Sequence, residues 1–279
     1  MTTENLRTNL YQTHVDLGAR IVPFGGWDMP VQYPSGILAE VRAVRYAAGI
    51  FDVSHMGRLY ISGAKATELL DWVLTGSAAD LRSGRARYCL ICNENGGVID
   101  DTIFYKLAEN HYLLIPNAGN RAQVAAWFQH WIDKKFAGTC QVEDRTISTA
   151  LIAFQGPKTP SIIDRLCGSL ISDLRPFTWT ETTMQGAQLL VGRTGYTGED
   201  GFEVLTRATD AKLVWTALQE AGAVPCGLGA RDVLRLEAGF PLHGHEIDEN
   251  TTPIEAGLER FVNFDKNHVG SMALQQQRN

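Results

Sequence analysis

The sequence predicts an α+β fold, in which hairpins of antiparallel strands are combined with separate helices. Helices are indicated by apolar residues that recur at spacings of three and four, and strands by apolar and β-branched runs that end in polar turns. Two of these turns, NENGG at residues 93–97 and LAEN at residues 107–110, are short enough to join antiparallel neighbours. Because the chain lacks the regular alternation of strands and helices that builds a parallel sheet, α+β is the expected class.

Six helices are predicted, the clearest of them over residues 120–135. In this segment Val124, Phe128 and Trp131 fall on one face at helical spacing. Asn120 is a suitable N-cap for this helix, with Gln123 three residues further on. The other five ranges, most of which are followed by a glycine that favours helix termination, are 35–48, 64–73, 160–167, 211–221 and 230–238.

Seven strands are predicted from apolar runs that polar turn residues bound on both sides. No internal repeat and no linker-like stretch interrupts these elements, so composition alone predicts no domain boundary. The seven ranges are 58–61, 86–92, 98–106, 111–116, 150–154, 188–192 and 201–206.

Length and composition are those of a globular protein with a substantial core. The chain has 279 residues, of which 44% are hydrophobic, enough for one large domain or two ordinary ones. A net charge of −6 argues against a nucleic-acid partner, because binding to phosphates requires a concentrated basic surface. No apolar run approaches the length that crosses a bilayer, and the first residues lack the apolar core of a signal peptide. We therefore expect a cytoplasmic protein with no membrane partner.

The five cysteines are an odd number, which favours reduced thiols over a set of disulfides. Cys89 and Cys92 have a spacing that a redox site or half of a zinc site would use. Their surroundings predict a strand, however, in which residues three apart point to opposite faces. Since no second pair completes a tetrahedral site, we interpret both as core residues and expect no metal.

The stretch VIDDTIFY places two adjacent acids at the start of an apolar strand. Strand alternation puts Asp100 and Asp101 on opposite faces, and both faces also carry apolar side chains. A buried carboxylate is costly unless it is paired or hydrogen-bonded. Either one acid caps the turn at Gly96 and Gly97 while the other pairs with an arginine, or one of them is a functional carboxylate. The pattern leaves both interpretations open.

Two further segments place charged residues in unusual settings. Glu203 lies inside the apolar strand FEVL, after a glycine-rich turn, and could accept hydrogen bonds from an arginine or from a ligand with paired N–H groups. Arg231 opens a short helix, as a surface residue or as the cation that answers one of the acids. His243 and His245, in HGH, lack a third metal ligand and are interpreted as polar loop residues.

Eight blocks, in order along the chain, resemble aminomethyltransferase, the T-protein family of the glycine cleavage system. Eight ordered blocks do not arise from composition alone, so the resemblance is specific. The blocks are FGGWDMPVQY (24–33), FDVSHMG (51–57), NENGGVIDD (93–101), PNAG (116–119), FQGP (154–157), GYTGEDGFE (195–203), ARDVLRLEAG (230–239) and EIDENTTPIEAGL (246–258).

The resemblance implies a tetrahydrofolate-dependent enzyme. It would take an aminomethyl group from the lipoyl arm of the carrier H-protein, convert tetrahydrofolate to 5,10-methylenetetrahydrofolate and release ammonia. Asp101 falls at the position of the family's catalytic carboxylate, where it would stabilise positive charge as a carbon–sulfur bond breaks. The positions that resemble the folate pocket are Glu203 and Arg231 for the pterin and folate, and Met56, Tyr88, Tyr105, Asn117 and Tyr196 for the remainder.

The resemblance also implies two interleaved lobes of antiparallel sheet with flanking helices. The first lobe would comprise residues 1–52 and 141–228, and the second residues 53–140 and 229–270. Family members continue into a C-terminal barrel-like lobe, which would begin near residues 271–279 and is not expected in this sequence. Two alternatives stay open, namely another folate-dependent one-carbon transferase or demethylase on the same scaffold, and a truncated, inactive folate-binding relative.

Overall fold

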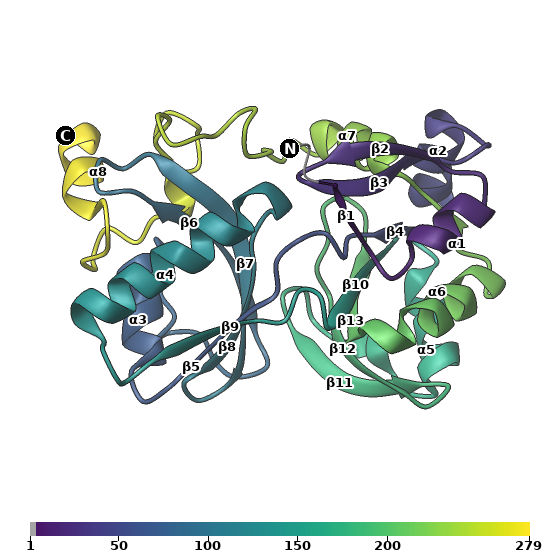
Figure 1. The fold of residues 1–279 in the computed structure, drawn as a ribbon, viewed down its shortest axis with the longest axis horizontal. Coiled ribbons are helices and arrows are strands. Elements are labelled where there is room, and N and C mark those ends of the chain that lie inside the picture. The colour runs from purple at the N-terminus through teal and green to yellow at the C-terminus, as the bar shows by residue number, and fades with distance from the viewer. Residues whose placement is uncertain (1–3) are drawn as a thin grey trace. The chain divides into compact units, whose positions relative to one another are not determined.

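The computed structural model describes residues 4 to 279 and divides into two compact units that interleave along the chain (Figure 1). Unit 1 comprises the chain up to His55 together with Thr146–Phe240. Unit 2 comprises Met56–Arg145 and Pro241–Asn279. Both units combine helices with mainly antiparallel sheets, which confirms the predicted α+β class.

The units and the lobes implied by the resemblance differ most at the end of unit 1. The resemblance assigns residues 229 to 240 to the second lobe, whereas they lie in unit 1. The physical reason is the packing of helix α7 (Leu228–Glu237), which contacts helix α2 (Ile37–Tyr46) and strand β3 (Trp27–Gln32) of that unit. Arg231 therefore belongs to unit 1.

Unit 1 contains a six-stranded sheet and a smaller three-stranded sheet. In the large sheet all neighbours are antiparallel except its last strand, which is parallel to its neighbour. Its strands, in spatial order, are β11 (Trp179–Met184), β12 (Ala187–Gly192), β13 (Gly201–Arg207), β10 (Thr149–Gln155), β4 (Gly49–Asp52) and β14 (Val224–Pro225). The small sheet has the order β1 (Leu6–Arg7), β3 and β2 (Arg20–Phe24).

Two helices of unit 1 lie against the large sheet, namely α5 (Thr159–Cys167) and α6 (Ala211–Glu220) (Figure 1). Helix α6 places Val214, Trp215 and Leu218 in the core, and Trp215 is fully buried. From the sheet, the same core receives Ile50, Ile152, Phe154, Phe202 and Val204. Burial of this apolar surface is the main term that stabilises the unit.

The N-terminal helix α1 (Tyr11–Asp16) is held to the large sheet by a buried polar cluster. His14 Nε2 lies 3.0 Å from Asp52 Oδ2, and the Thr8 hydroxyl donates to the same oxygen at 2.6 Å. The Tyr33 hydroxyl lies 2.8 Å from His14 Nδ1. Burial opposes ionisation of Asp52, but its hydrogen bonds and the charge of His14 prevail and lower the pKa of its carboxyl.

Unit 2 is built on one five-stranded antiparallel sheet. Helices α3 (Ala66–Val73) and α4 (Arg121–Lys135) cover one face of it, where Leu70 and Phe128 pack on the sheet (Figure 1). Its strands, in spatial order, are β6 (Ala86–Cys92), β7 (Val98–Ala108), β8 (His111–Ile115), β5 (Leu59–Ser62) and β9 (Gln141–Asp144). The polar turns at 93–97 and at 109–110 join β6 to β7 and β7 to β8, as the sequence predicts.

The other face of β6 and β7 is covered by the C-terminal part of unit 2, which ends in helix α8 (Ser271–Arg278). Leu90 and Cys92 pack there with Leu274, whereas Cys89 lies in the cluster beneath α3 and α4. Both thiols are fully buried on opposite faces of β6. Burial raises the pKa of each thiol, so both are inert core residues, as predicted.

Gly97, in the turn between β6 and β7, is expected to tolerate no side chain. A Cβ atom at this position would lie 1.8 Å from the Glu249 carbonyl oxygen, so the backbone would have to move. We expect Gly97→Ala to lower the free energy of unfolding by about 1–3 kcal/mol. Gly119→Ala is the matched control, since a Cβ at Gly119 meets no atom within 4 Å. Urea unfolding of both variants measures the difference, and equal stabilities would contradict it.

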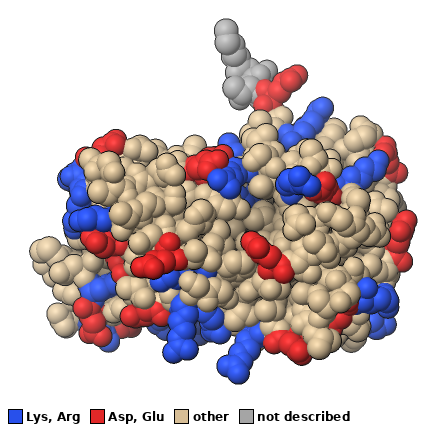
Figure 2. Space-filling view, turned by 90° about the horizontal axis from the view of Figure 1, so that it is seen from below, with Lys and Arg blue, Asp and Glu red and all other residues tan. Residues whose placement is uncertain are grey.

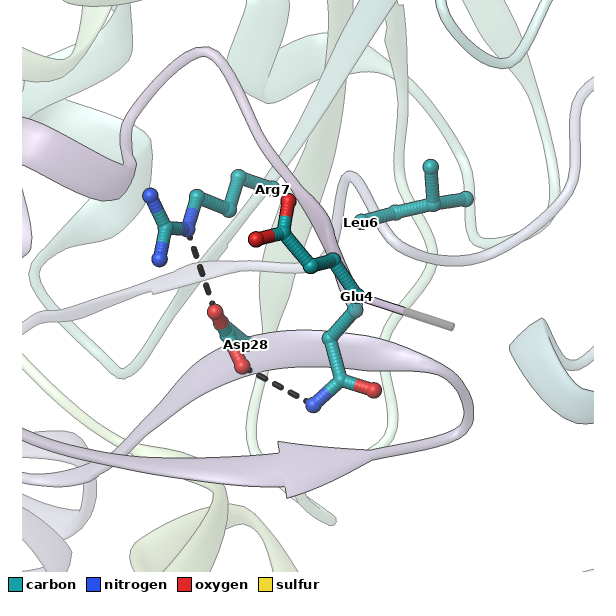
Figure 3. Close-up of a pocket in the computed structure, with 5 residues that line it drawn as sticks. Glu4, Leu6, Arg7 and Asp28 are labelled. Atoms are coloured by element: carbon teal, nitrogen blue, oxygen red, sulfur yellow. Dashed lines mark hydrogen bonds and ion pairs between the residues drawn. The ribbon is translucent and has the colours of Figure 1, made fainter. Parts of the chain in front are cut away.

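The described surface mixes charges of both signs. Figure 2 shows one face on which lysine and arginine side chains are interspersed with acidic ones. A hollow in unit 1 is lined by Glu4, Asn5, Leu6, Arg7 and Asp28. Within it the Asn5 amide and the Arg7 guanidinium both donate to Asp28, which lowers the pKa of that carboxyl (Figure 3). Between residues 4 and 279, no helix has the length and apolar character needed to span a membrane.

Candidate active site

Asp100 and Asp101 lie on strand β7 and point to opposite faces of the unit 2 sheet. Asp101 is paired with Leu90 and Asp100 with Ile91, and residues directly opposite in a ladder share a face. Leu90 packs against the C-terminal segment and Ile91 against the helices. Asp100 has no exposed surface, whereas Asp101 keeps 8% of its surface exposed. Of the two acids, Asp101 alone keeps some exposed surface.

Asn117 lies beside Asp101, just beyond the end of strand β8. Ile103 pairs with Ile115, so if the ladder of β7 and β8 continued for two more residues, Asp101 would lie opposite Asn117. Strand β8 ends at Ile115, because Pro116 follows and has no N–H to donate. The side chain of Asn117 supplies the missing donor. Its Nδ2 lies 3.1 Å from the Asp101 carbonyl oxygen and 2.8 Å from Asp101 Oδ1.

Asp100 is surrounded by amide donors from the turn before α4. Its Oδ2 accepts from the Asn117 backbone N–H at 2.9 Å. Its Oδ1 lies 2.8 Å from Asn117 Nδ2 and 2.7 Å from Asn120 Nδ2. Asn120 is the N-cap residue of α4, as predicted, but its side chain makes no capping bond and binds Asp100 instead. An N-terminal helix end also favours a nearby negative charge.

One interpretation of the sequence was that one of the two acids caps the turn and the other pairs with an arginine. The structure shows neither arrangement. The turn at 93–97 is closed by Asn93, whose Oδ1 accepts from the backbone N–H groups of Asn95 and Gly97. Asp101 receives the Tyr88 hydroxyl at 3.0 Å on Oδ2 and Asn117 on Oδ1. Within residues 4 to 279 neither acid forms an ion pair with lysine or arginine.

Two buried carboxyl groups that form no ion pair with lysine or arginine are reluctant to ionise together. Burial raises the pKa of Asp100 to about 7, and repulsion from Asp101 adds to the shift against the effect of its three hydrogen bonds. Burial also raises the pKa of Asp101. The hydrogen bonds from Tyr88 and Asn117, and the charge of a protonated His243, oppose that rise. The pair is therefore poised to hold a proton close to neutral pH.

His243 was interpreted from sequence as a polar loop residue, but its side chain has a defined place in unit 2. Its Nε2 lies 3.0 Å from the Val98 carbonyl oxygen, and its charge acts on Asp101. His245 is exposed. Within residues 4 to 279, no group of three or more histidine, cysteine and acidic side chains is arranged to hold a metal ion.

The other predicted site residues of unit 2 lie near Asp101 to different degrees. Tyr88 contacts it directly, and the Tyr88 ring packs edge-on against Phe261 with centroids 4.6 Å apart. Tyr105 is on the same face of β7, four residues further along, and is buried. Met56 is partly buried in the turn before β5, where its carbonyl oxygen accepts from the Arg58 guanidinium.

In unit 1, Glu203 occupies a central position in the large sheet. Strand β13 pairs it with Ala153 on one side and with Gly192 on the other. The side chain is largely buried, and the Thr194 hydroxyl donates to its Oε2 at 2.5 Å. A carboxylate that is fixed in this way presents a defined acceptor to a ligand.

Arg231 and Tyr196 form a stacked group in unit 1. The Arg231 guanidinium carbon lies 4.6 Å from the centre of the Tyr196 ring, and the Tyr196 ring is stacked on Phe240 with centroids 5.7 Å apart. Burial lowers the pKa of Arg231, while the charge of Glu203 opposes this effect. The interpretation of Arg231 as an ordinary surface residue is therefore wrong. Its guanidinium packs over the Tyr196 ring, and the charge of Glu203 acts on it.

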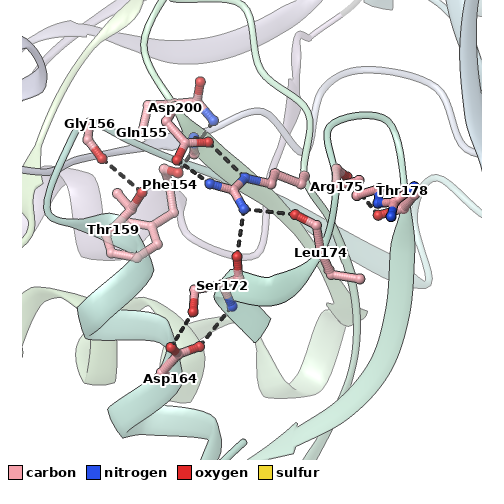
Figure 4. A network of polar contacts seen from close by, with 12 residues as sticks. Phe154, Gln155, Gly156, Thr159, Asp164, Ser172, Leu174, Arg175, Thr178 and Asp200 are labelled. Atoms are coloured by element: carbon pink, nitrogen blue, oxygen red, sulfur yellow. Dashed lines mark hydrogen bonds and ion pairs between the residues drawn. The ribbon is translucent and has the colours of Figure 1, made fainter. Parts of the chain in front are cut away.

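The loop that carries Thr194 and Tyr196 is anchored at both ends. Arg193 binds Asp200 through two nitrogens and donates to the carbonyl oxygens of Ser172 and Leu174 at 2.6 and 2.7 Å (Figure 4). The buried Gln155 side chain donates to the Thr194 carbonyl oxygen at 3.1 Å. These bonds fix the loop backbone, so the positions of the Thr194 and Tyr196 side chains are set by the sheet.

Comparison with known proteins gives the family. An aminomethyltransferase of Symbiobacterium thermophilum is 48% identical over 267 residues, which are 93% of this chain and 71% of the relative. One of Rubrobacter xylanophilus is 46% identical over 98% of this chain and 72% of the relative. The family model described as the GCVT N-terminal domain matches residues 10–266. The chain belongs to the aminomethyltransferase family.

A solved structure agrees with this assignment. The glycine cleavage system aminomethyltransferase T of Bartonella henselae superimposes with a TM-score of 0.91 at 36% identity, over 98% of this chain and 74% of that chain. The predicted aminomethyltransferase family and fold are thus confirmed. The chain spans about three quarters of the length of the aminomethyltransferases that it matches.

The structure places the predicted residues of this aminomethyltransferase in two groups. Asp101, Tyr88 and Asn117 are in direct contact in unit 2. Arg231 and Tyr196 are in contact in unit 1, with Glu203 nearby. Sequence reasoning missed the contributions of Asn120, Thr194, Phe240 and His243. For Asn120 and His243 the pattern gave no signal, because their partners lie 20 or more residues away.

Proposed function

We propose that this aminomethyltransferase takes an aminomethyl group from the lipoyl arm of a carrier H-protein and transfers its carbon to tetrahydrofolate, with release of ammonia. The observation that carries the proposal is Asp101, a largely buried carboxylate that keeps some exposed surface and, among the described residues, forms no ion pair with lysine or arginine. Desolvated negative charge that is held by neutral donors is suited to stabilise positive charge that develops on a substrate.

The residues of unit 1 fit the pterin of tetrahydrofolate. A flat ring with neighbouring N–H groups requires a fixed carboxylate and a planar packing surface. Glu203, held by Thr194, supplies the carboxylate. Tyr196 and the Arg231 guanidinium supply the planar surface, which Phe240 supports from behind Tyr196. We assign Glu203 to recognition of the pterin N–H groups. We assign Tyr196 and Arg231 to packing against the pterin ring, with Arg231 also supplying a positive charge.

Asp101 acts on the reacting carbon. Tetrahydrofolate, when bound, supplies the nitrogen atoms that receive this carbon. As the carbon–sulfur bond to the lipoyl arm breaks, positive charge grows on the carbon, and the fixed Asp101 carboxylate lowers the energy of that charge. Because burial raises its pKa, Asp101 is also suited to accept a proton from a folate nitrogen and return it.

Tyr88 and Asn117 are assigned to the support of Asp101. Each donates one hydrogen bond to a different oxygen of its carboxylate, which fixes the orientation of the group. Preorganised donors of this kind require little rearrangement during the reaction. Tyr105 and Met56 have no such bond to Asp101, and we assign them to the walls of the folate site.

The proposed reaction is tested by its requirement for two substrates at once. Purified chain is titrated with tetrahydrofolate, with and without aminomethylated H-protein, while released ammonia is measured. We expect rapid ammonia release only when both are present. Release that does not depend on the carrier protein would favour a demethylase or another one-carbon transferase. Folate binding without any release would favour the inactive relative and would contradict the proposal.

A further inference from the structure

We propose that Asp100 is a positioning residue for Asp101. Asp100 holds Asp101 in place through the side-chain amide of Asn117, which both acids share, and its negative charge influences the uptake of a proton by Asp101. This inference rests on the proposed catalytic role of Asp101. It assigns to Asp100 a function in the reaction although that side chain has no exposed surface and cannot contact a substrate.

The shared amide is the structural link between the two acids. Asn117 Nδ2 lies within hydrogen-bond distance of three oxygens, namely Asp100 Oδ1 at 2.8 Å, Asp101 Oδ1 at 2.8 Å and the Asp101 carbonyl at 3.1 Å. An amide nitrogen carries only two hydrogen atoms. The three oxygens therefore compete for two donors, and a change in the charge of one carboxylate alters how strongly the amide holds the other.

Asp100 in turn fixes the amide that holds Asp101. It accepts from both the backbone N–H and the side chain of Asn117, so the whole residue is bound at two points. Asn120 donates to Asp100 Oδ1 and also to the Ile99 carbonyl oxygen, which anchors this arrangement to β7. If Asp100 lost its acceptor character, Asn117 would be free to turn away from Asp101.

Charge couples the two acids as well. The negative charge of Asp101 contributes to the raised pKa of Asp100, and repulsion between two groups acts equally on both. The other titratable groups that face the pair are Tyr88 and Cys89 on β6 and His243 in the C-terminal segment. While both acids are ionised, each opposes the charge of the other, so replacement of Asp100 by a neutral residue should lower the pH at which the site first takes up a proton.

Asp100→Asn is the test of this inference. The new side chain has one acceptor oxygen where three donors converge, so Asn117 loses part of its support. We expect kcat to fall about tenfold while the KM for tetrahydrofolate changes less than about twofold. The acid limb of the pH profile of kcat should move to lower pH by about one unit.

Two further variants separate positioning from a general loss of structure. Asp71→Asn removes a carboxylate of α3 that accepts the Ala78 backbone N–H and has no hydrogen bond to either acid of the pair, so it should leave the pH profile unchanged. The double variant Asp100→Asn with Asn120→Asp exchanges the two side chains, so that an amide occupies position 100 and a carboxylate occupies position 120. It should recover part of kcat and move the acid limb back towards that of the parent chain.

Stability provides a readout that does not require activity. The carboxyl pKa of Asp100 is raised from 3.8 to about 7 on folding, so the folded chain holds a proton that the unfolded chain has released. The protonated Asp100 carboxyl therefore contributes fully to the stability of the folded chain below pH 3.8, and this contribution is lost as the pH rises through 7. The difference in free energy of unfolding between the parent and Asp100→Asn should therefore narrow from pH 5 to pH 8.

The outcomes distinguish this inference from the function on which it rests. If Asp101→Asn keeps its activity, the proposed function fails. If Asp101→Asn is inactive while Asp100→Asn has the kcat and the acid limb of the parent chain, Asp100 is only a structural residue and this inference alone is overturned. A lowered kcat with a displaced acid limb supports it.

Discussion

Asp101→Asn is expected to lower kcat for aminomethyl transfer by about 10²- to 10³-fold, since it removes the negative charge that we propose stabilises the reacting carbon. The variant should fold normally. Asparagine has the same shape, Asn117 can still donate to its amide oxygen, and the Tyr88 hydroxyl can accept from its NH₂ group as readily as it donates. Steady-state ammonia release together with a thermal unfolding curve measures both properties.

The control for this variant is Asp133→Asn. Asp133 is an exposed residue of α4 that accepts from the Gln129 side chain, and its replacement removes the same charge from the same unit. We expect kcat within about twofold of the parent chain, because exposed charges contribute little. Equal activity of Asp101→Asn and Asp133→Asn would show that the carboxylate of Asp101 has no part in the chemistry.

Glu203→Gln is expected to raise the KM for tetrahydrofolate about 10- to 100-fold with a much smaller change in kcat. Glutamine presents an NH₂ group where the carboxylate presents an acceptor, so one ligand N–H would meet a donor, at a cost of about 1–3 kcal/mol. Thr194 can still donate to the remaining oxygen, which keeps the local structure intact. Initial rates over a range of tetrahydrofolate concentrations separate KM from kcat.

Glu181→Gln is the matched control for the pterin site. Glu181 is exposed on β11 of the same sheet, so its replacement removes an equal charge without touching β13. Its KM for tetrahydrofolate should equal that of the parent chain. An unchanged KM in Glu203→Gln would instead remove Glu203 from the folate site and leave Arg231 and Tyr196 without their carboxylate partner.

The elements with strong periodicity were predictable from the sequence. Strand β6 has the predicted bounds, and α4 begins one residue after its predicted start. The small sheet of unit 1 was not predicted, because Pro30 interrupts the apolar run of β3. The structure tolerates this proline because β1 pairs only with Trp27 and Asp28, so no neighbour on that side requires the missing N–H.

Candidate site residues could be singled out from the sequence where a side chain is unusual for its own strand, whereas their distant hydrogen-bond partners could not. Asp101 and Glu203 stand out because each is an acid within an apolar strand. Asn120 is the N-cap residue of α4, as predicted, but the pattern that favours an N-cap contains no information about its bond to Asp100 on strand β7. The support of Asp101 by Asn117 depends on the register of β7 and β8 and on the end of β8 at Ile115. Sequence patterns within one segment do not determine such a register.

The most direct test of the account is a single turnover by Asp101→Asn, with folate binding measured in the same sample. The variant and the parent chain are each mixed in excess with aminomethylated H-protein and saturating tetrahydrofolate. We expect both to bind tetrahydrofolate equally well and ammonia to appear rapidly only with the parent chain. Ammonia release at the parent rate from the variant would contradict the claim that this buried carboxylate drives the transfer.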